Sequence, residues 1–371
     1  MMDLALNEEL KIYKQTFHEF MQVECPPEMV REVELGDTGY SHIIWQKMAK
    51  LGWLGIGLDE EHAENGNDMV IACLLCEEMG RVLLPVPYIS TVVLGGSVLR
   101  VNRGEVLHDE ILKAIGNGEC IISSALMEGE RFENIESPQC KASKKGGTYL
   151  LTGSKKYVEN AHASDYLLLT ARARDGLTLF LVDPRSEGIA LTEQRAMGGE
   201  KLFTVSLTGV KVDPIGIVGE AGKAWPSLEN ALARSKTALA ARMIGSAAAV
   251  IDRSVQYAKE RIQFDKPIGS FQAIAFRLAD MATGLLGARL LMYKAAWMID
   301  REKPAAVREA AMAKAFVAEL HRLITDVGVH TYGGYGFMLE HDMQLFYRRA
   351  KAEEMAYGDA RYNRSLICPY P

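Results

Sequence analysis

Apolar residues recur at helical spacing in the first third of the chain. Intervals of three and four between apolar positions, with polar faces between them, predict amphipathic helices in ELKIYKQTFHEFM, SHIIWQKMAKLGWLG and DMVIACLLCEEMGRVLL. Gly80 and Pro85 follow the last of these runs and mark its end. We therefore expect an N-terminal helical domain over residues 1–118.

Between residues 119 and 222 the pattern changes to that of strands. Short segments rich in β-forming residues are separated by Gly, Asp, Pro or Ser, and Phe203, Val205 and Leu207 alternate strictly with other residues. This stretch predicts a compact antiparallel β domain.

From about residue 223 the helical spacing returns and persists to the end. Two long apolar stripes are predicted to lie in the core of a bundle, one through Leu278, Met281 and Leu285 and another through Phe316 and Leu323. Helices, then strands, then helices, without βαβ alternation, argue against a doubly wound sheet. The sequence thus predicts an α+β multidomain protein that ends in a four-helix-type bundle over residues 223–371.

Composition narrows the function classes. A chain of 371 residues is long enough for two or three cores. Its net charge of -6 shows no excess of basic residues of the kind that binds nucleic acid. The first twenty residues carry acids and no long apolar run, so we expect neither a signal peptide nor a membrane span, and we expect a cytoplasmic protein without a membrane partner.

The cysteines point away from disulfide and metal chemistry. Six of them are scattered over the chain, too few for a disulfide scaffold of this size. Cys73 and Cys76 form a C-x-x-C pair, but no second pair follows and both stand in an apolar helical run. We interpret them as buried helix residues and expect no metal site.

Two segments carry candidate chemistry. RIQFDKPIGSFQ, residues 261–272, is a charged turn between two helices, and its arginine fork, amides and aromatics suit a diphosphate and a nucleotide. A solvated loop is the alternative. YGGYG, residues 332–336, has adjacent glycines that let backbone N–H groups approach a ligand. Leu339 stands where a third glycine of G-x-G-x-x-G belongs, and no strand precedes it, so a Rossmann site is excluded.

With these motifs in order, the sequence resembles the acyl-CoA dehydrogenase family almost from end to end. The matching segments are LGWLGIGLDEEHAENG, GSKKYVENAHASDYLLLTAR, VGEAGKAW, ERIQFDKPIGSFQAIAFRLADM and TYGGYGFMLEHDMQLFYRRAK. The resemblance implies FAD as cofactor, an acyl-CoA as substrate and electron-transferring flavoprotein as the usual electron acceptor. It also implies an oligomer, because in this family the last two segments serve the FAD of a neighbouring subunit.

The resemblance assigns residues to each part of the site. Arg261 and Gln263 match the diphosphate contacts, and Phe264 and Gln272 take supporting roles around the cofactor. The adenosine end is matched by Gly333, Gly334 and Gly336.

Two further residues match positions at the flavin and the substrate. Tyr157 stands where the family usually has a Trp against the flavin ring. Lys236 matches a conventional Arg near the CoA end of the substrate.

The catalytic base is the main departure from the family. Family chemistry is α,β-dehydrogenation, in which a carboxylate removes the α proton and the flavin takes the β hydride. Tyr357 occupies the position of the common catalytic Glu, and Ser235 occupies the position used by other members. A tyrosine with an ordinary pKa of about 10 is a poor base at neutral pH. Asp359 is only two positions away, but on a helix two residues point about 200° apart, so it would face away unless the segment is a loop.

The flavin wall departs as well. Met127 begins MEGERFE where the family has a Gly-rich segment with hydroxyl donors, and Glu159 stands where a Thr or Ser would donate toward the flavin. An ionised Glu only accepts hydrogen bonds, and its charge disfavours a reduced, anionic flavin.

Two hypotheses remain open. One is the base-lacking subunit of a heteromeric acyl-CoA dehydrogenase, similar to those of bacterial steroid side-chain degradation, whose partner subunit carries the base. The other is a self-sufficient dehydrogenase of an unusual, for example cyclic, acyl-CoA that uses Asp359 or Tyr357. The sequence does not identify the acyl group, because that depends on the shape of the pocket.

Overall fold

A computed structural model describes residues 6–58 and 66–368, which form two compact units. The first, here the bundle unit, contains the described residues up to Arg31, the segment Met69–Leu84 and the chain from Lys236 onward. The second, the β unit, contains the described part of Glu32–Asp68 and the segment Pro85–Ser235. The N-terminal helices are therefore shared between the units, and the division at residues 118 and 222 stays a prediction.

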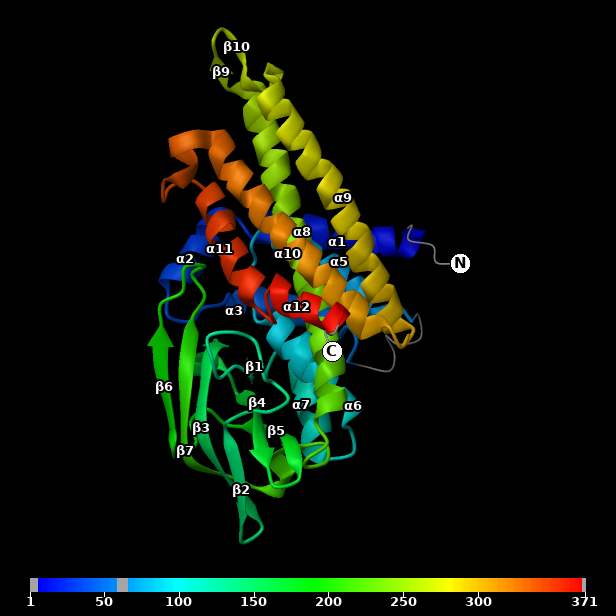
Figure 1. Ribbon diagram of the computed structural model, residues 1–371, viewed down its shortest axis with the longest axis vertical. Coiled ribbons are helices and arrows are strands. Elements are labelled where there is room, and N and C mark those ends of the chain that lie inside the picture. The colour runs from blue at the N-terminus through cyan, green and yellow to red at the C-terminus, as the bar shows by residue number, and fades with distance from the viewer. Residues whose placement is uncertain (1–5, 59–65, 369–371) are drawn as a thin grey trace. The chain divides into compact units, whose positions relative to one another are not determined.

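Long helices dominate the bundle unit (Figure 1). The helices are α1 (Glu8–Glu24), α5 (Asp68–Arg81), α8 (Trp225–Glu260, most of which lies here), α9 (Gln272–Asp300), α10 (Ala306–Tyr332), α11 (Met343–Met355) and α12 (Ala360–Ile367). A further helix, α2 (Pro27–Leu35), links the two units along the chain. None of the helices in the described part of the chain is long and apolar enough to cross a membrane.

The two predicted core stripes have different outcomes. Leu278, Met281 and Leu285 of α9 are buried, as their spacing predicts. The stripe on α10 was wrongly assigned to the core, because Phe316 and Leu323 are 43% and 52% exposed. The buried face of α10 mixes alanines and polar residues with a few larger apolar side chains: Ala310, Ala311, Ala313, Lys314, Val317, Ala318, His321, Ile324, Thr325, Gly328 and Val329. Helical spacing gave the helix, but not its buried face.

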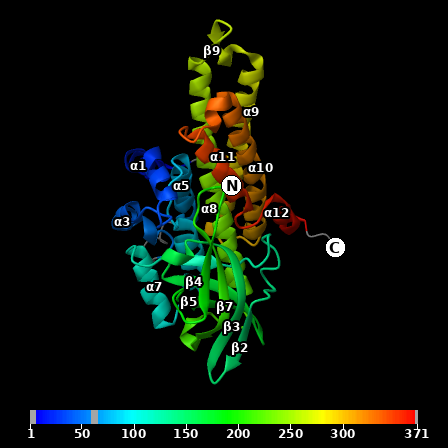
Figure 2. The same cartoon turned by 90° about the vertical axis from the view of Figure 1, so that its left-hand side faces the viewer.

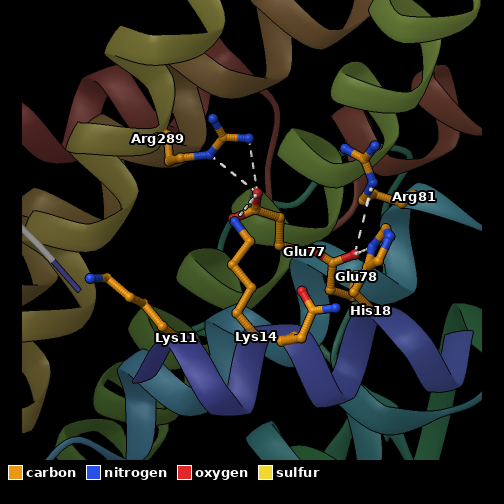
Figure 3. Close-up of a pocket in the computed structure, with 8 residues that line it drawn as sticks. Lys11, Lys14, His18, Glu77, Glu78, Arg81 and Arg289 are labelled. Carbon is orange, nitrogen blue, oxygen red and sulfur yellow. Dashed lines mark hydrogen bonds and ion pairs between the residues drawn. The ribbon is translucent and has the colours of Figure 1, made fainter. Parts of the chain in front are cut away.

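Buried acids tie α1 to α5 and α9 within the bundle unit (Figure 3). Glu77 of α5 accepts hydrogen bonds from Arg289 of α9 at 2.9 Å and from Lys14 of α1 at 3.2 Å. Next to it, Glu78 lies 2.8 Å from His18 of α1. Buried carboxylates are tolerated when paired in this way, which explains two acids in the middle of an apolar run.

The cysteines of the same helix, Cys73 and Cys76, are free and buried. Burial raises the pKa of the Cys76 thiol to about 12. Such thiols stay protonated at neutral pH and are poor nucleophiles. Among the described residues, no group of three or more His, Cys, Asp or Glu could hold a metal ion.

A twisted sheet forms the centre of the β unit. Its strands are β1 (Ile122–Ala125), β2 (Lys141–Lys145), β3 (Thr148–Glu159), β4 (Tyr166–Ala173), β5 (Gly176–Val182), β6 (Ile189–Gln194), β7 (Leu202–Val212) and β8 (Ile217–Val218). They lie in the order β6-β7-β3-β2-β4-β5-β8, with β1 beside β4. Phe203, Val205 and Leu207 of β7 are buried, as their alternation predicts.

The sheet is not antiparallel throughout. β1 and β2 each pair with β4 in parallel, while the other named pairs of this sheet are antiparallel. Two parallel strands need a long connection that returns the chain to the same end of the sheet. Between β1 and β4 this connection includes the 15-residue stretch from β1 to β2. The helical elements of this unit are α3 (His42–Lys50), the short turns η1 (Trp53–Gly55), η3 (Ala161–Ala163) and η4 (Pro214–Gly216), the π-helix η2 (Ile89–Gly96), α6 (Ser97–Val101) and α7 (Val106–Gly116).

A short β-hairpin with a two-residue turn joins α8 to α9, in the segment where the sequence predicts a charged turn. Its strands are β9 (Ile262–Gln263) and β10 (Lys266–Pro267), followed by the short turn η5 (Ile268–Ser270). The central residues Phe264 and Asp265 have φ of 55° and 63°. Positive φ at both central positions is the signature of a type I′ turn, which matches the twist of the flanking strands.

Candidate active site

The hairpin presents the predicted diphosphate residues to the outside. The backbone N–H of Arg261 donates to Tyr257 at 2.8 Å and its carbonyl accepts from Ile268 at 2.8 Å, so the position of this residue is fixed at the end of α8. Its side chain is exposed, and within residues 6–58 and 66–368 it has no hydrogen-bond or ion-pair partner. Gln263 and Gln272 are exposed as well.

Phe264 is the most exposed large apolar side chain of the described residues, at 86%. It also adopts a left-handed backbone conformation, which is unfavourable for a residue with a bulky side chain. Its ring meets Phe271 edge to face, with ring centroids 6.1 Å apart, and most of its surface stays open to solvent. The hairpin therefore leaves a large apolar area on the outside of its own fold.

The glycine motif lies near the same end of the bundle unit. It forms the short turn η6 (Gly333–Phe337) after α10. Tyr332, just before it, stacks on Tyr257 of α8 with ring centroids 4.2 Å apart and donates to the carbonyl of Arg253 at 2.9 Å. Since Tyr257 lies one turn before Arg261, the stack brings the glycine motif and the hairpin to one end of the bundle.

The three predicted glycines are not equivalent. Gly333 has a φ of 64°, and a Cβ there or at Gly334 would meet nothing within 4 Å. Their backbone is therefore open to a ligand. Gly336 is buried, and a Cβ there would lie 2.8 Å from Tyr332. Its role in this structure is close packing on α10.

In the β unit, the predicted flavin-wall residues lie next to one another. The carbonyl of Met127 accepts a hydrogen bond from Lys156 at 2.8 Å, which places Met127 beside Tyr157. The pairing of β3 with β7 shifts register at this point, and Tyr157 has a φ of 55°. A bulge of this kind re-aims a side chain, and Tyr157 stays 39% exposed.

Glu159 ends the same strand two residues later. It pairs with Leu202 of β7, and its carbonyl accepts a hydrogen bond from Ser123 at 2.7 Å. The three residues that depart from the family pattern are thus gathered at one edge of the β unit.

The loop that begins at Met127 is anchored by a buried ion pair. Glu128 accepts a hydrogen bond from Lys155 at 2.7 Å and from the backbone N–H of Cys140 at 3.0 Å. Lys155 is fully buried and also donates to Thr170 at 2.9 Å. Glu128 therefore joins the start of the loop between β1 and β2 to its end at Cys140.

In the bundle unit, the position of the usual catalytic Glu is a turn between α11 and α12. Tyr357 and Gly358 have φ of 55° and 96°. Of the two alternatives considered for Asp359, the loop is the one observed, because α11 ends at Met355. Asp359 is instead the N-cap of α12, where its carboxylate accepts the backbone N–H of Tyr362 at 2.8 Å.

A buried lysine holds this turn. The ammonium group of Lys314 donates to the carbonyl oxygens of Glu354, Glu353 and Gly358 at 3.0, 3.1 and 3.3 Å. The carbonyls of Glu353 and Glu354 lie at the end of α11, where the helix dipole favours a cation, and that of Gly358 lies in the turn that follows. Asn363 also donates to the Gly358 carbonyl, at 2.8 Å. Burial lowers the pKa of Lys314 to about 7.

A buried carboxylate accompanies this lysine. Glu353 pairs with Arg242 of α8 at 2.7 Å and lies 3.6 Å from His321 of α10. Burial lowers the pKa of His321 to about 3, so the ring is neutral, and it lies 2.8 Å from the Ser246 hydroxyl. No sequence motif pointed to this polar cluster. A lysine inside the apolar run AAMAKAFVA was the one available signal.

The remaining predicted residues lie on α8. Lys236 is buried, and its ammonium group lies 5.0 Å from the centre of the Tyr362 ring. This cation–π contact places Lys236 beside the turn that carries Asp359. The hydroxyl of Ser235 donates to the Ala231 carbonyl at 2.8 Å, within the helix.

Comparisons with known proteins now identify the class. Family models of the acyl-CoA dehydrogenase N-terminal, middle and C-terminal domains match residues 7–119, 126–211 and 222–368. The chain belongs to the acyl-CoA dehydrogenase family, and the fold and enzyme class expected from the sequence are confirmed.

Relatives and solved structures agree over nearly the whole chain. The chain is 31% identical to the caffeyl-CoA reductase-Etf complex subunit CarC of Acetobacterium woodii, covering 98% of each chain. It is similar to a chain of the ChsE4-ChsE5 complex of Mycobacterium tuberculosis, with a TM-score of 0.89, 27% identity and complete coverage of both. A glutaryl-coenzyme A dehydrogenase matches with a TM-score of 0.91 and 26% identity, over 99% of this chain and 95% of that one.

The family is one of flavoproteins, and the residues of the two units suit different parts of FAD. The bundle unit fits the cofactor's diphosphate and adenosine half, because it offers an outward guanidinium at Arg261 and open backbone at Gly333 and Gly334. The β unit offers an aromatic ring at Tyr157 but a thioether at Met127 and a carboxylate at Glu159. The residues present therefore suit the nucleotide end of FAD well. At the flavin-ring end they provide fewer hydroxyl donors.

Proposed function

We propose that this chain is a FAD-dependent subunit for α,β-dehydrogenation of a CoA thioester, and that a partner subunit supplies the catalytic base. The observation that carries the proposal is the turn at residues 356–359. Tyr357 stands in the position of the usual Glu, and the carboxylate of Asp359 is engaged as a helix cap. At Ser235, the alternative position, the hydroxyl is engaged within its own helix.

The absence of a free carboxylate at both positions has a kinetic consequence. A positioned general base contributes typically about 10²–10⁴-fold to proton abstraction. When bound, FAD accepts the hydride that leaves the β carbon. The chain's own residues serve to bind and orient: Lys236 faces the CoA end, and Tyr157 forms part of the wall against the flavin ring.

The exposed hairpin supports the assembly part of the proposal. Arg261, Gln263 and Phe264 extend outward rather than into their own fold. We infer that they contact the FAD of a neighbouring subunit, with Gly333 and Gly334 at its adenosine end. A chain without its own base can complete a partner's site in this way.

Exposed apolar side chains also favour an oligomer. They occur along α9 and α10: Phe276, Leu286, Leu290, Phe316 and Leu323. Large exposed apolar areas mark interaction surfaces in soluble proteins. Homo- and hetero-oligomers both remain consistent with such a surface. The similar ChsE4-ChsE5 complex, which contains two named chains, favours a second acyl-CoA dehydrogenase subunit as the partner.

We propose electron-transferring flavoprotein as the electron acceptor, because the relative from Acetobacterium woodii is named as a subunit of an Etf complex. The acyl group is not assigned.

Anaerobic flavin bleaching tests the function. The purified chain alone should not reduce bound flavin with a panel of saturated acyl-CoAs, whereas an assembly with a partner subunit that carries the Glu should. Rapid bleaching by the isolated chain that survives Tyr357→Phe and disappears in Asp359→Asn would overturn the partner hypothesis. Asp359 would then be the base of a self-sufficient dehydrogenase.

Flavin occupancy tests the hairpin. Arg261→Ala should lower the FAD content of the assembled oligomer, because it removes the proposed diphosphate contact. Arg308→Ala, at an exposed arginine near the start of α10, is the matched control and should leave occupancy unchanged. Equal occupancy in both variants contradicts the assignment. Light scattering that shows a monodisperse 41 kDa species contradicts the oligomer.

A further inference from the structure

The sheet of the β unit divides at one end. β2 pairs with β3 along its whole length, from Lys141 opposite Thr152 to Lys145 opposite Thr148. It pairs with β4 at one position alone, Lys141 opposite Arg172. Beyond this pair the two strands separate, and the β2–β3 hairpin extends past the neighbouring strands (Figure 2).

A hollow of about 550 Å³ lies at this division. We call it the split groove, and it is lined by Lys141, Ala142, Ser143, Lys144, Tyr149, Arg172, Ala173, Arg174 and Asp175. Its polar walls come from β2 and from the turn between β4 and β5. The whole groove belongs to the β unit.

Positive charge is concentrated in the split groove. Its lining contains four cations (Lys141, Lys144, Arg172 and Arg174) and one acid, Asp175, in a protein whose net charge is -6. All four cations are exposed. Apart from Lys144, which lies 5.7 Å from the centre of the Tyr149 ring, the side chains of these cations have no ion-pair, hydrogen-bond or ring partner in the described part of the chain. Four positive charges against one negative charge favour an anionic ligand.

The groove also exposes a strand edge. The carbonyl of Cys140 accepts a hydrogen bond from Arg172 at 2.8 Å, so it points toward β4. Backbone groups alternate in direction along a strand, and those of Lys144 therefore point the same way, beyond the point where pairing with β4 ends. An unpaired strand edge is a template for an additional strand.

These two features together favour a polypeptide over a small anion. The cations of β2, which are Lys141, Lys144 and Lys145, are spread over about 13 Å of extended chain rather than converging on one point. Lys141 and Lys145 share one face of the strand, so acids at every second position of an extended segment would meet both, and its backbone would pair with the free edge. Edge lysines repel a second copy of the same edge, but they attract an acidic strand.

We propose that the split groove is a docking site for an extended acidic segment of a partner protein, which adds to the free edge of β2. Strand addition supplies the backbone hydrogen bonds, and the four cations supply the selectivity for acidic side chains. The site uses none of the residues assigned to the cofactor or the substrate.

Peptide binding to the full-length protein tests the proposal. The probe is a fluorescein-labelled peptide of alternating Glu and Val, EVEVEV, measured by fluorescence anisotropy against the uncharged peptide QVQVQV. We expect EVEVEV to bind more tightly and to weaken as salt is raised from low to high concentration. The double variant Lys141→Gln/Arg174→Gln should weaken binding by about fivefold or more, since two exposed charge pairs are lost.

Controls separate the proposal from its alternatives. Lys50→Gln/Lys113→Gln removes two exposed lysines of the same unit that lie on α3 and α7. This variant should not change binding of the peptide. An equal loss of binding would show that the net charge of the protein, and not the split groove, attracts the peptide, and would overturn the site. An EVEVEV peptide with alternate backbone nitrogens methylated should bind more weakly, and equal binding overturns strand addition. Pyrophosphate that binds more tightly than the peptide would reassign the groove to a small anion.

Discussion

Two buried lysines, one in each unit, hold segments of the candidate site by different means. In the β unit, Lys155 pairs with the carboxylate of Glu128 at 2.7 Å and anchors the loop that begins at Met127. In the bundle unit, Lys314 donates to the backbone carbonyls of the turn that carries Tyr357. One charge is compensated by an opposite charge, and the other chiefly by the carbonyl dipoles of a helix end.

The difference has consequences for stability and for pH. Burial lowers the pKa of both lysines, but Glu128 counteracts this at Lys155 through charge and a hydrogen bond. At Lys314, the acids Glu353, Glu354 and Asp359 raise the pKa and Lys236 lowers it further. A change at Lys155 therefore leaves a carboxylate that has other donors, whereas a change at Lys314 leaves several carbonyls without their cation.

Removal of the Lys314 ammonium should have the largest effect. Lys314→Met should cost about 3–5 kcal/mol of stability, because a buried cation that satisfies several acceptors is lost. Urea unfolding gives the cost, and hydrogen exchange should show faster exchange in α11, α12 and the turn between them. If Lys314→Met lost less stability than Lys155→Met, the proposed difference between the two lysines would be contradicted.

Removal of the Lys155 ammonium should cost less. Lys155→Met should lose about 2–3 kcal/mol, since Glu128 is left without its cation but keeps backbone donors at Gln139 and Cys140. Adding Glu128→Gln removes the unpaired charge and keeps an acceptor for those donors. Urea unfolding of the double variant should therefore show partial recovery, and additive losses would contradict a direct pair.

The pH dependence of stability should also separate the two lysines. Lys314 titrates near pH 7 in the folded protein and near its ordinary 10.5 when unfolded, so between these values the unfolded state binds more protons. Stability should therefore rise with pH across this window, by up to about 1.4 kcal/mol per pH unit from this one group.

Unfolding of wild-type protein and Lys314→Met at a series of pH values measures this contribution as the difference of the two slopes. Identical slopes would show that the three carbonyls keep the ammonium charged at all these pH values.

The cap of α12 should give the smallest effect. Asp359→Ala should cost about 1 kcal/mol, because the Tyr362 N–H loses its acceptor, while Asn keeps the cap and should cost only a few tenths. Thermal unfolding of the two variants measures this difference. Equal losses would show that the charge of Asp359, and not its capping hydrogen bond, supports the turn held by Lys314.

Sequence periodicity predicted the type of most elements, but the face that each helix buries only in part. The stripe through Leu278, Met281 and Leu285 lies in the core, whereas the equally apolar stripe through Phe316 and Leu323 is exposed. A 3.6-residue period shows that a helix has an apolar side. It does not show whether that side faces its own bundle or the surface.

The candidate site also has one part that the sequence predicted and another that required the structure. The motif at residues 261–272, together with the family resemblance, was sufficient to select Arg261, because the residues that carry it are adjacent in the chain. The hairpin that turns Phe264 outward, and the cap formed by Asp359, required the structure. Both depend on backbone angles that no residue pattern in these segments signalled.

The sequence by itself determined the family and the order of helical and strand regions, since each is a property of neighbouring residues. Only the tertiary structure revealed the buried role of Lys314, whose acceptors lie 39 to 44 residues further along the chain. It also revealed the split groove, where β2 and β4 separate after one pair. Burial and charge compensation depend on which distant segments meet, and local spacing does not contain that information.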